Sequence, residues 1–549
     1  MENLNIGVDN FIQAINNYYV DKTLLIKDFV HKCKYQTVLF TKPRRFGKTL
    51  NLSMLDYFFS NKGDYLFAFK DKKICNCDFD YQEYINKFPV IHLNMKDISS
   101  NNLKEFIQDI INELSRVYKS FPELLNYNFQ YEIDKETYLS ISNKKSLELN
   151  YYSTAIKNLS DYLYQYYQKP VVILIDEYDT PLNVAFQKGF FDEVINFFRK
   201  LYSSALKSNG NLLFSVLTGV FEISKESIFS ELNNTSIYTV MDESFSKYFG
   251  FTTEEVNQIL NDFNINTSLD ELKLWYGGYG NSTEIFNLWS ILNFVNHRVL
   301  MTYWNNTGSN FAITSILKND VVLIDDLNDY INGNKVFLFY NGISFDDLYS
   351  DIDILLSLLV HAGYLKAKLF ELPNKYYVSL PNLEITTVFE REIISKVSNT
   401  NFLKLANDFR IAIEDCNDQK IQNILTDMIS SSFSCFDLNN EKEYQTLITG
   451  IMAILFGDYL VKSEVVGRNG RSDIMLSPKE KNKLGIIIEL KKLKGVVSKN
   501  KISQSATSAI KQIENHNYYQ ELVKRECKKI FLYAFVFDDK NSFVKSVKK

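Results

Sequence analysis

Short apolar runs alternate with longer polar segments of helical spacing through the first half of this chain. Runs with the length and β-branched content of buried strands occupy residues 36–40, 88–93, 171–175 and 211–219. Between them, apolar residues recur with helical spacing, as in 50–58 and 101–168. This alternation predicts an α/β fold, a parallel sheet wrapped by helices, in which ligands bind at the carboxyl ends of the strands.

The last part of the chain repeats the pattern on a smaller scale. Segments with strand character cover 459–466, 470–476, 485–491 and 529–537, and helical spacing covers 443–451 and 503–522. Residues 311–435 alternate helices with short β segments and contain no motif that we can assign. We therefore expect three parts: a parallel-sheet domain at 1–310, a mostly helical middle region at 311–435, and a small α/β domain at 436–549.

Composition agrees with a globular chain of several domains. The 549 residues are 46% apolar and 23% charged. We expect a cytoplasmic protein without a membrane span, because there is neither an 18-residue apolar run nor a secretory signal pattern at the start. The 6 Cys and 5 His are scattered, which argues against a disulfide framework or a zinc site.

Charge is distributed unevenly along the chain. Residues 441–549 contain 21 Lys and Arg against 12 Asp and Glu, a net charge of +9, whereas the remainder carries a net charge of −14. A basic segment on an acidic body suggests contact with a polyanion such as nucleic acid. A solvated, lysine-rich surface would produce the same count.

A Gly-Lys-Thr sequence stands between the first predicted strand and the next predicted helix. In this context backbone N–H groups at the helix start would face phosphates, Lys48 would reach the outer phosphates and Thr49 would hold Mg²⁺. Lys42 stands where the usual phosphate-loop pattern has Gly, and Pro43, Arg44 and Arg45 follow it. An ordinary strand-turn-helix connection remains the alternative.

A second motif strengthens the nucleotide hypothesis. The apolar strand 171–175 ends in Asp176 and Glu177. A carboxylate at this place holds the Mg²⁺ of a bound nucleotide, and a following Glu can orient an attacking water. Lys48, Asp176 and Thr218 would all fall at the carboxyl edge of the sheet. The alternative is a core strand with a solvated acidic end.

Two aromatic and glycine-rich turns follow the predicted sheet, at 275–280 and 303–308. They could frame a nucleotide base or close the domain by packing. We favour packing, because aromatic turns serve it more often.

The C-terminal strands carry a second candidate site. Period-two spacing places Glu489 and Lys491 on one face of a strand, and Asp473 on a neighbouring strand can meet them. Two carboxylates form a hard oxygen site for Mg²⁺ or Mn²⁺, to which Glu443 could add a ligand. A nearby lysine can position or help deprotonate water and stabilise charge on a phosphate, which is metal-assisted phosphodiester hydrolysis. A surface ion pair at strand edges is the alternative.

Several motifs together carry a resemblance that covers most of the chain. They are Tyr-Val-Asp-Lys-Thr at 19–23, Pro-Arg-Arg-Phe-Gly-Lys-Thr at 43–49, Leu-Ile-Asp-Glu-Tyr-Asp at 174–179, Ser-Lys-Glu-Ser-Ile-Phe-Ser at 224–230, Tyr-Phe-Gly-Phe-Thr at 248–252, and the set Arg471, Asp473, Glu489 and Lys491. With these the sequence resembles bacterial proteins that have an N-terminal AAA-ATPase-like domain and a C-terminal, restriction-endonuclease-like domain of the PD-(D/E)XK nuclease superfamily.

The resemblance implies a role for each matching residue. It implies ATP binding in the loop of Arg45, Gly47, Lys48 and Thr49, with Mg²⁺ on Thr49 and Asp176 and with Glu177 orienting water. It also implies a nuclease centre of Asp473, Glu489 and Lys491, with Gln512 near it. Glu222 departs from the pattern where Arg is expected, and this leaves open whether ATP is hydrolysed or only bound.

Two functions of different classes fit these observations. The first is an ATP-regulated nuclease that acts on DNA or RNA and combines a probable ATPase with a metal-dependent phosphodiesterase. The second is a nucleotide-dependent switch or scaffold whose C-terminal domain binds nucleic acid without cutting it. Arg44 and Arg45 could serve a neighbouring copy of the chain as readily as their own loop, so a homo-oligomer stays open.

Overall fold

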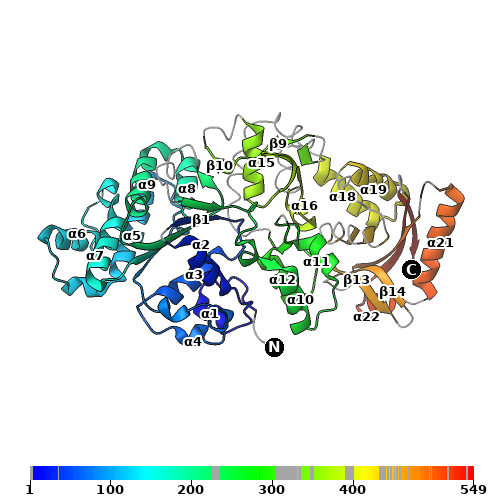
Figure 1. The fold of residues 1–549 in the computed structure, drawn as a ribbon. Helices are drawn as coiled ribbons and strands as arrows, with labels where there is room; N and C mark the ends of the chain where they lie inside the picture. The colour runs from blue at the N-terminus through cyan, green and yellow to red at the C-terminus, as the bar shows by residue number, and fades with distance from the viewer. Residues whose placement is uncertain are drawn as a thin grey trace.

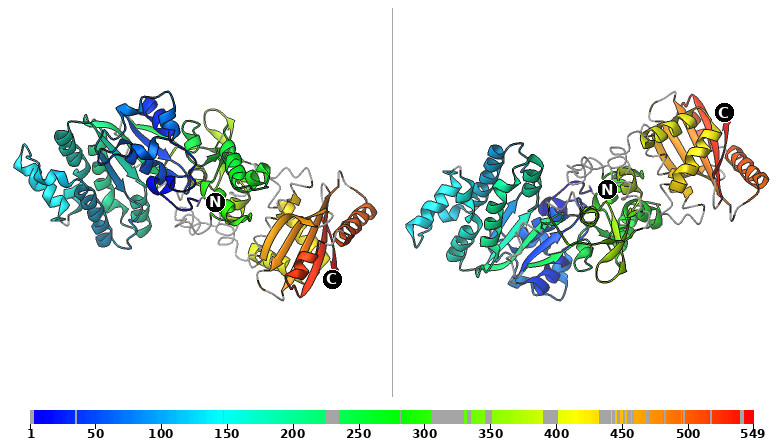
Figure 2. Two further views of the ribbon diagram at one scale, coloured as in Figure 1. Left: turned by 90° about the horizontal axis from the view of Figure 1, so that it is seen from below. Right: turned by 90° about the horizontal axis from the view of Figure 1, so that it is seen from above.

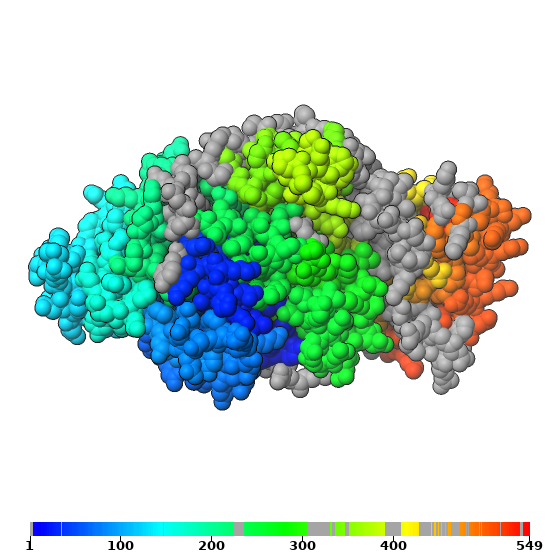
Figure 3. Space-filling model, in the orientation of Figure 1, coloured from blue at the N-terminus to red at the C-terminus, as the bar shows by residue number. Residues whose placement is uncertain are grey.

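The computed structural model describes most of the chain. Described are residues 4–34, 36–146, 148–223, 235–280, 282–304, 330–331, 335–345, 351–389, 401–431, 459–467, 470–478, 483–493, 497–515, 518–538 and 542–549, with single positions at 480, 495 and between 441 and 456. The N-terminal half and the C-terminal strands lie at opposite ends of an elongated molecule (Figures 1 and 3).

Five parallel strands form the N-terminal sheet, in the order β2-β3-β4-β1-β6. They are β1 (Thr37–Thr41), β2 (Val90–Asn94), β3 (Val171–Asp176), β4 (Leu212–Gly219) and β6 (Thr235–Tyr238). The first four confirm the predicted strands. The fifth was not predicted, because all four of its residues are only half-buried and it lacks the continuous apolar run of the others.

Helices cover both faces of this sheet (Figure 1). They are α1 (Phe11–Ile15), α2 (Leu24–Cys33), α3 (Lys48–Phe59), α4 (Leu66–Phe69), α5 (Leu103–Lys119), α6 (Glu132–Ser142), α7 (Ala155–Tyr167), α8 (Thr180–Lys188) and α9 (Phe191–Leu206). Every residue of β1 and β3 is buried, as expected for central strands enclosed on two sides. The predicted parallel sheet wrapped by helices is therefore confirmed.

Smaller elements follow beside the carboxyl edge of the sheet. They are β5 (Glu222–Ile223), β7 (Phe251–Thr252), α10 (Thr253–Asp262), α11 (Leu269–Tyr276), β8 (Ile285–Phe286) and α12 (Leu288–His297). Trp275, Tyr276 and Tyr279 in the first aromatic turn are buried, and so is Trp304 in the second. The aromatic side chains in the described part of these turns therefore pack in the protein interior, whereas residues 305–308 lie outside the described residues.

Helices dominate the described residues between 311 and 435, beside a three-stranded antiparallel sheet. The elements are β9 (Phe337–Leu338), β10 (Gly342–Ile343), α15 (Ile352–His361), β11 (Lys366–Glu371), β12 (Lys375–Ser379), α16 (Leu383–Phe389), α18 (Asn401–Glu414) and α19 (Asp418–Ser431). The short strand β10 pairs with β5 and so ties this region to the N-terminal part.

The C-terminal sheet has the order β13-β14-β15-β16-β17. Its elements are β13 (Tyr459–Gly467), β14 (Gly470–Pro478), β15 (Leu484–Lys492), α21 (Lys499–Asn515), α22 (Gln520–Lys524), β16 (Lys529–Phe537) and β17 (Ser542–Lys548). Figure 2 shows α18 and α19 on one face of this sheet and α21 on the other. The packing of α19 on β17 brings helices from before residue 436 onto the C-terminal sheet.

Two details differ from the sequence-based expectation. A single helix was expected at 503–522, but α21 ends at Asn515, a residue type of low helix propensity, and α22 begins at Gln520. Strand β17 follows the strand that we expected to be the last, and its polar residues, among them Lys545 and Lys548, concealed it. Among the described residues, no helix combines the length and apolar character needed to cross a bilayer.

Candidate functional site

The loop between β1 and α3 has the backbone shape that a phosphate-binding turn needs. Arg45 has φ 65° and Gly47 has φ 81°, so both adopt the left-handed conformation. Glycine reaches this conformation without the steric cost that a side chain adds. Gly47 precedes Lys48, the first residue of α3, and both line a cavity, so the start of the helix is directed at that space.

Lys48 is buried at the start of α3, and its ammonium donates to the carbonyl oxygens of Lys42 (2.8 Å) and Pro43 (3.0 Å). Burial lowers the pKa of Lys48, although the acidic side chains of Glu177, Asp179 and Asp176 oppose the shift. No carboxylate among the described residues forms an ion pair with Lys48. Its positive charge is therefore held by neutral carbonyl groups beside the cavity, which is a suitable arrangement for receiving an anion.

Lys42, which departs from the usual loop pattern, does not line the cavity. Its buried ammonium donates to the carbonyl oxygen of Thr239 (2.5 Å) and lies over the ring of Phe249. Burial lowers its pKa to about 8. Lys42, which stands where the usual pattern has Gly, thus anchors the loop to the residue that follows β6. Its side chain stays out of the cavity in which phosphates would bind.

Asp176 is the last residue of β3 and Thr218 the last but one of the neighbouring β4, so both lie at the carboxyl edge of the sheet, as predicted. The Thr218 hydroxyl donates to Oδ1 of Asp176 (2.5 Å), while Oδ2 of Asp176 is buried without a hydrogen-bond partner in the described structure. A buried, unpartnered carboxylate oxygen is costly unless something binds it. Thr49 and Glu177 line the cavity, whereas Asp176 lies behind its wall, next to Glu177 in the chain. The Thr49 hydroxyl and this carboxylate oxygen are the hard oxygen atoms that Mg²⁺ prefers, so their chemistry fits the predicted metal.

Glu177 has the left-handed φ of 51° and lines the cavity. Its Oε2 accepts a hydrogen bond from the Thr180 hydroxyl (3.1 Å), which fixes the carboxylate at the cavity wall. The position beside Asp176 is compatible with the predicted role of orienting a water.

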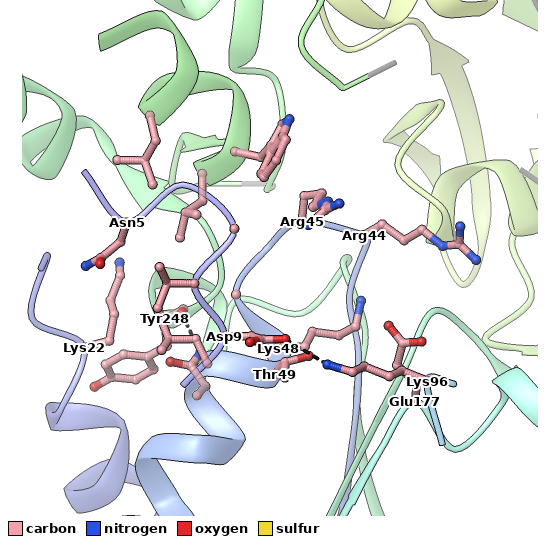
Figure 4. Close-up of a pocket in the computed structure, with 18 of the residues that line it drawn as sticks. Asn5, Asp9, Lys22, Arg44, Arg45, Lys48, Thr49, Lys96, Glu177 and Tyr248 are labelled. Atoms are coloured by element: carbon pink, nitrogen blue, oxygen red, sulfur yellow. Dashed lines mark hydrogen bonds and ion pairs between the residues drawn. The ribbon is translucent and has the colours of Figure 1, made fainter. Parts of the chain in front are cut away.

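The cavity has a volume of about 420 Å³, within the range of small-molecule sites. One end is charged, and Figure 4 shows the side chains of Lys48, Lys96 and Glu177 gathered there. Elsewhere the lining includes the apolar or aromatic side chains of Tyr19, Leu288 and Leu292, and Figure 4 shows Asn5 and Lys22 at the end opposite Lys96. A ligand with an anionic end and a flat or apolar part matches this lining, and a nucleotide is such a ligand.

Arg45 lies between these two ends. Its guanidinium stacks over the indole of Trp289 on α12, 4.2 Å from the ring centre, and the indole N–H donates to the carbonyl oxygen of Tyr303. Burial and the neighbouring Arg44 lower the pKa of Arg45. The stack brings α12 to the predicted cofactor-binding loop.

Other motifs of the resemblance have structural roles. The buried ammonium of Lys22 pairs with Glu255 (2.5 Å) and donates to the carbonyl oxygen of Lys247, so its charge is compensated. Gly250 has φ 94° and donates its N–H to the carbonyl oxygen of Phe46, which binds the 248–252 motif to the loop. The 224–230 motif lies outside the described residues.

The C-terminal cluster faces α21. Alternate residues of β15 point to opposite sides: Ile486, Ile488 and Leu490 belong to a core shared with α18 and α19, and Ile487 belongs to a core shared with α21. Glu489 and Lys491 therefore lie on the α21 face. The register pairs Ile474 of β14 with Ile488, so Asp473 lies one position further, beside Glu489, and the three predicted residues come together.

Hydrogen bonds fix this cluster. The Lys491 ammonium contacts Oε1 of Glu489 (3.2 Å), and the N–H of Leu490 donates to Oδ2 of Asp473 (2.7 Å). Oε2 of Glu489 is buried and has no partner in the described structure. Burial, together with the charge of Asp473, raises the pKa of Glu489 to about 7, although Lys491 opposes the shift.

The electrostatics also distinguish the two roles proposed for Lys491. Burial lowers the pKa of Lys491, but Glu489, Glu441 and Asp473 outweigh it and raise the pKa overall. Lys491 is thus an ammonium at neutral pH. This favours stabilisation of phosphate charge over deprotonation of water.

Two family models match separate parts of the chain. Residues 5–229 match the model of a predicted AAA-ATPase (AAA-ATPase-like), and residues 439–547 match that of the PD-(D/E)XK nuclease superfamily. The chain joins an AAA-ATPase-like domain to a PD-(D/E)XK nuclease superfamily domain. The match confirms the resemblance found in the sequence.

Two individual proteins were also similar to the chain. The uncharacterized protein in the vnfD 5′ region of Azotobacter chroococcum mcd 1 is 24% identical over 425 residues, which are 74% of this chain and 75% of that protein. Among solved structures, the Aeropyrum pernix ORC2 protein (ADPNP–ADP complexes) has 12% identity and a TM-score of 0.27, covering 69% of this chain and 93% of that one. A TM-score this low does not establish a common fold.

Within the nuclease superfamily domain, the predicted ligand Glu443 lies outside the described residues. Glu441, which sequence reasoning missed, contacts Lys491 (3.6 Å) and accepts from the N–H of Lys492 (3.2 Å). Its place two residues before Glu443 was the available signal. No group of three or more His, Cys, Asp and Glu that could hold a metal occurs in the described part of the chain.

Tyr518 connects Gln512 with the cluster of Asp473, Glu489 and Lys491. The Gln512 side chain hydrogen-bonds to Tyr518, and the charges of Glu489, Asp473 and Lys491 all act on the Tyr518 hydroxyl; burial is the main cause that raises the pKa of this tyrosine. The side chain of Arg471 lies outside the description.

Proposed function

We propose that this protein binds ATP with Mg²⁺ and that its nucleotide state regulates a metal-dependent nuclease centre acting on DNA or RNA. The phosphates would lie at the start of α3, against Gly47 and Lys48. Thr49 and Asp176 would hold Mg²⁺, which neutralises phosphate charge when bound. Glu177 would orient a water if hydrolysis takes place.

At the nuclease centre, Asp473 and Glu489 would hold the metal. A divalent ion there supplies charge stabilisation and a bound water of lowered pKa. The N–H of Leu490 fixes the orientation of Asp473, and the Lys491 ammonium is placed to balance negative charge on the scissile phosphate. The net charge of +9 over 441–549 favours contact with a nucleic-acid backbone.

A chain of contacts between the two sites carries the proposed regulation. Trp304 donates from its indole to the carbonyl oxygen of Arg44 in the loop, in a long hydrogen bond of 3.5 Å. The backbone N–H of Trp304 donates to Glu384 on α16 (2.9 Å).

The neighbouring residue Leu383 continues this path. It belongs to the same cluster of buried apolar side chains as Ile474 and Leu490, which flank the nuclease residues. A change in the loop thus has a packed route toward the strand that carries Glu489 and Lys491.

The test is cleavage of plasmid DNA and single-stranded RNA with Mg²⁺ or Mn²⁺, with and without ATP. We expect cleavage to require metal, to respond to ATP, to disappear in Lys491→Ala and to persist in Lys499→Ala, which removes an exposed lysine of the same domain. Lys48→Ala should cleave without responding to ATP. Absence of cleavage under every condition, with ATP still bound, would refute the nuclease function and favour a switch or scaffold.

A further inference from the structure

Lys96 is a cation at the charged end of the cavity to which neither the motifs nor the resemblance assigns a role. It follows β2 in the loop at the carboxyl edge of the sheet. Asn94 is paired with Asp176 in register, and the N–H of Met95 donates to the carbonyl oxygen of Asp176 (3.0 Å). Lys96 therefore emerges directly beside the end of β3, and its side chain lines the cavity with Lys48 and Glu177.

Lys96 forms an ion pair with an acidic residue from a distant part of the chain. Its ammonium lies 3.0 Å from Oδ2 of Asp9, which precedes α1 and lines the same cavity. Figure 4 shows this pair reaching across the cavity beside Thr49. Asp9 thus places a carboxylate among the cations of the site, close enough for its charge to act on Arg45 as well.

Replacing Asp9 by another anion as the partner of Lys96 costs little free energy. The side chains of Lys96 and Asp9 retain 42% and 54% of their exposure, and an ion pair so open to solvent contributes about 0–1 kcal/mol. A phosphate oxygen competes well for such a lysine, since it carries more charge and is held by its covalent chain to the other phosphates. The bond to Asp9 is therefore weak enough for a nucleotide to replace.

Position indicates which phosphate would be contacted. The backbone at the start of α3 would face the inner part of a phosphate chain, and Lys48 would reach its outer phosphates. Lys96 stands beside Asp176 and Glu177, where the metal and the attacking water would belong. The group nearest to these two carboxylates is the terminal phosphate of a triphosphate.

Building on the proposed nucleotide function, we propose that Lys96 binds the terminal phosphate of a nucleoside triphosphate and that Asp9 holds this lysine while the cavity lacks one. Asp9 then acts as an internal competitor of the nucleotide. Its release on binding frees the segment before α1. Because a diphosphate lacks the group that Lys96 contacts, Lys96 contributes to discrimination between ATP and ADP.

The test measures ATP and ADP affinity by calorimetry of the full chain with Mg²⁺. Lys96→Ala should weaken ATP binding about tenfold, equivalent to ~1.4 kcal/mol, and should change ADP binding less than about twofold. Asp9→Asn should strengthen ATP binding about threefold or more, and this gain should shrink in the Lys96→Ala background. Asp97→Asn removes the same charge next to Lys96 but outside the cavity, and should have little effect.

The alternative roles give different results. If the pair only anchors the N-terminal segment, both variants lower affinity for ATP and ADP alike, which would overturn the proposal. If Lys96→Ala and Asp9→Asn leave affinity unchanged while Lys48→Ala abolishes it, the cavity binds nucleotide and only the role of Lys96 fails. If wild-type protein binds neither nucleotide, the proposed function itself fails.

Discussion

Glu489 offers the sharpest test of the nuclease centre, because its burial has a calculable cost. Its carboxyl is almost completely buried, and its pKa is raised from 4.5 to about 7. Since each pKa unit corresponds to ~1.4 kcal/mol, ionised Glu489 lowers the free energy of unfolding by about 3 kcal/mol above pH 7. The sign follows from linkage: stability is full below the unfolded-state pKa near 4.5 and is lost as the pH rises through about 7.

Glu489→Gln removes this cost while keeping the shape of the side chain. In EDTA we expect the variant and the wild type to have similar Tm at pH 4.5, and the variant to be more stable at pH 8, by about 10 °C in the transition of the C-terminal domain. Mg²⁺ should then raise the Tm of the wild type at pH 8 and leave Glu489→Gln unchanged. Glu480→Gln, an exposed change in the same domain, is the control.

Two results of this calorimetric experiment would refute the reasoning. Equal Tm of Glu489→Gln and wild type at both pH values would show that Glu489 is not a strained buried acid. Equal stabilisation of both by Mg²⁺ would show that the ion binds elsewhere.

Three further predictions concern the nucleotide site and its connection to the rest of the chain. Lys48→Ala should weaken ATP binding at least about 100-fold in calorimetry with little change in Tm, because its hydrogen bonds in the described structure are to two loop carbonyls; unchanged affinity would contradict the phosphate-loop assignment. Asp176→Asn should bind ATP in EDTA but lose the gain in affinity that Mg²⁺ gives the wild type; an intact gain would place the metal elsewhere. Glu384→Leu removes the carboxylate that accepts from the N–H groups of Tyr303 and Trp304 and from the Ser290 hydroxyl, which keeps only its longer bond to Asn287. It should lower the free energy of unfolding by about 3 kcal/mol or more in a denaturation experiment; a smaller loss than that of Ser357→Ala would contradict the central place of Glu384.

The sequence predicted the sheet, and the places of the candidate site residues on it, because both depend on local patterns. Fully buried strands such as β3 require uninterrupted apolar runs, and the carboxyl end of a parallel strand fixes where Asp176 must lie. Period-two spacing likewise placed Glu489 and Lys491 on one face before any contact was known. The structure adds what the pattern could not give, namely that this face is covered by α21.

What the sequence did not predict depends on contacts between distant residues. Asp9 and Lys96 are 87 positions apart and belong to no motif, so only the folded chain shows their ion pair. The contact of Glu441 with Lys491 joins residues on separate elements in the same way. Lys42 is instructive for the opposite reason: it looks like a defect of the loop, and only its burial against Thr239 shows that it leaves the cavity free.

Strand β15 would connect the proposed nucleotide and nuclease sites, which share no residue. Leu490 faces the core that continues to Leu383, while its neighbours Glu489 and Lys491 face α21. A displacement of this core therefore acts on the backbone between the two nuclease residues, and the Leu490 N–H is the group that orients Asp473. ATP can use this route only if it binds two arrangements of the loop with different affinity. In the proposed regulation, the contact from Trp304 to Arg44 would supply such a difference, because Arg44 precedes Arg45 in the loop proposed to hold the phosphates. Glu384→Leu should consequently still bind ATP, but its cleavage activity should no longer respond to ATP. Lys48→Ala should lose both ATP binding and the response of cleavage to ATP.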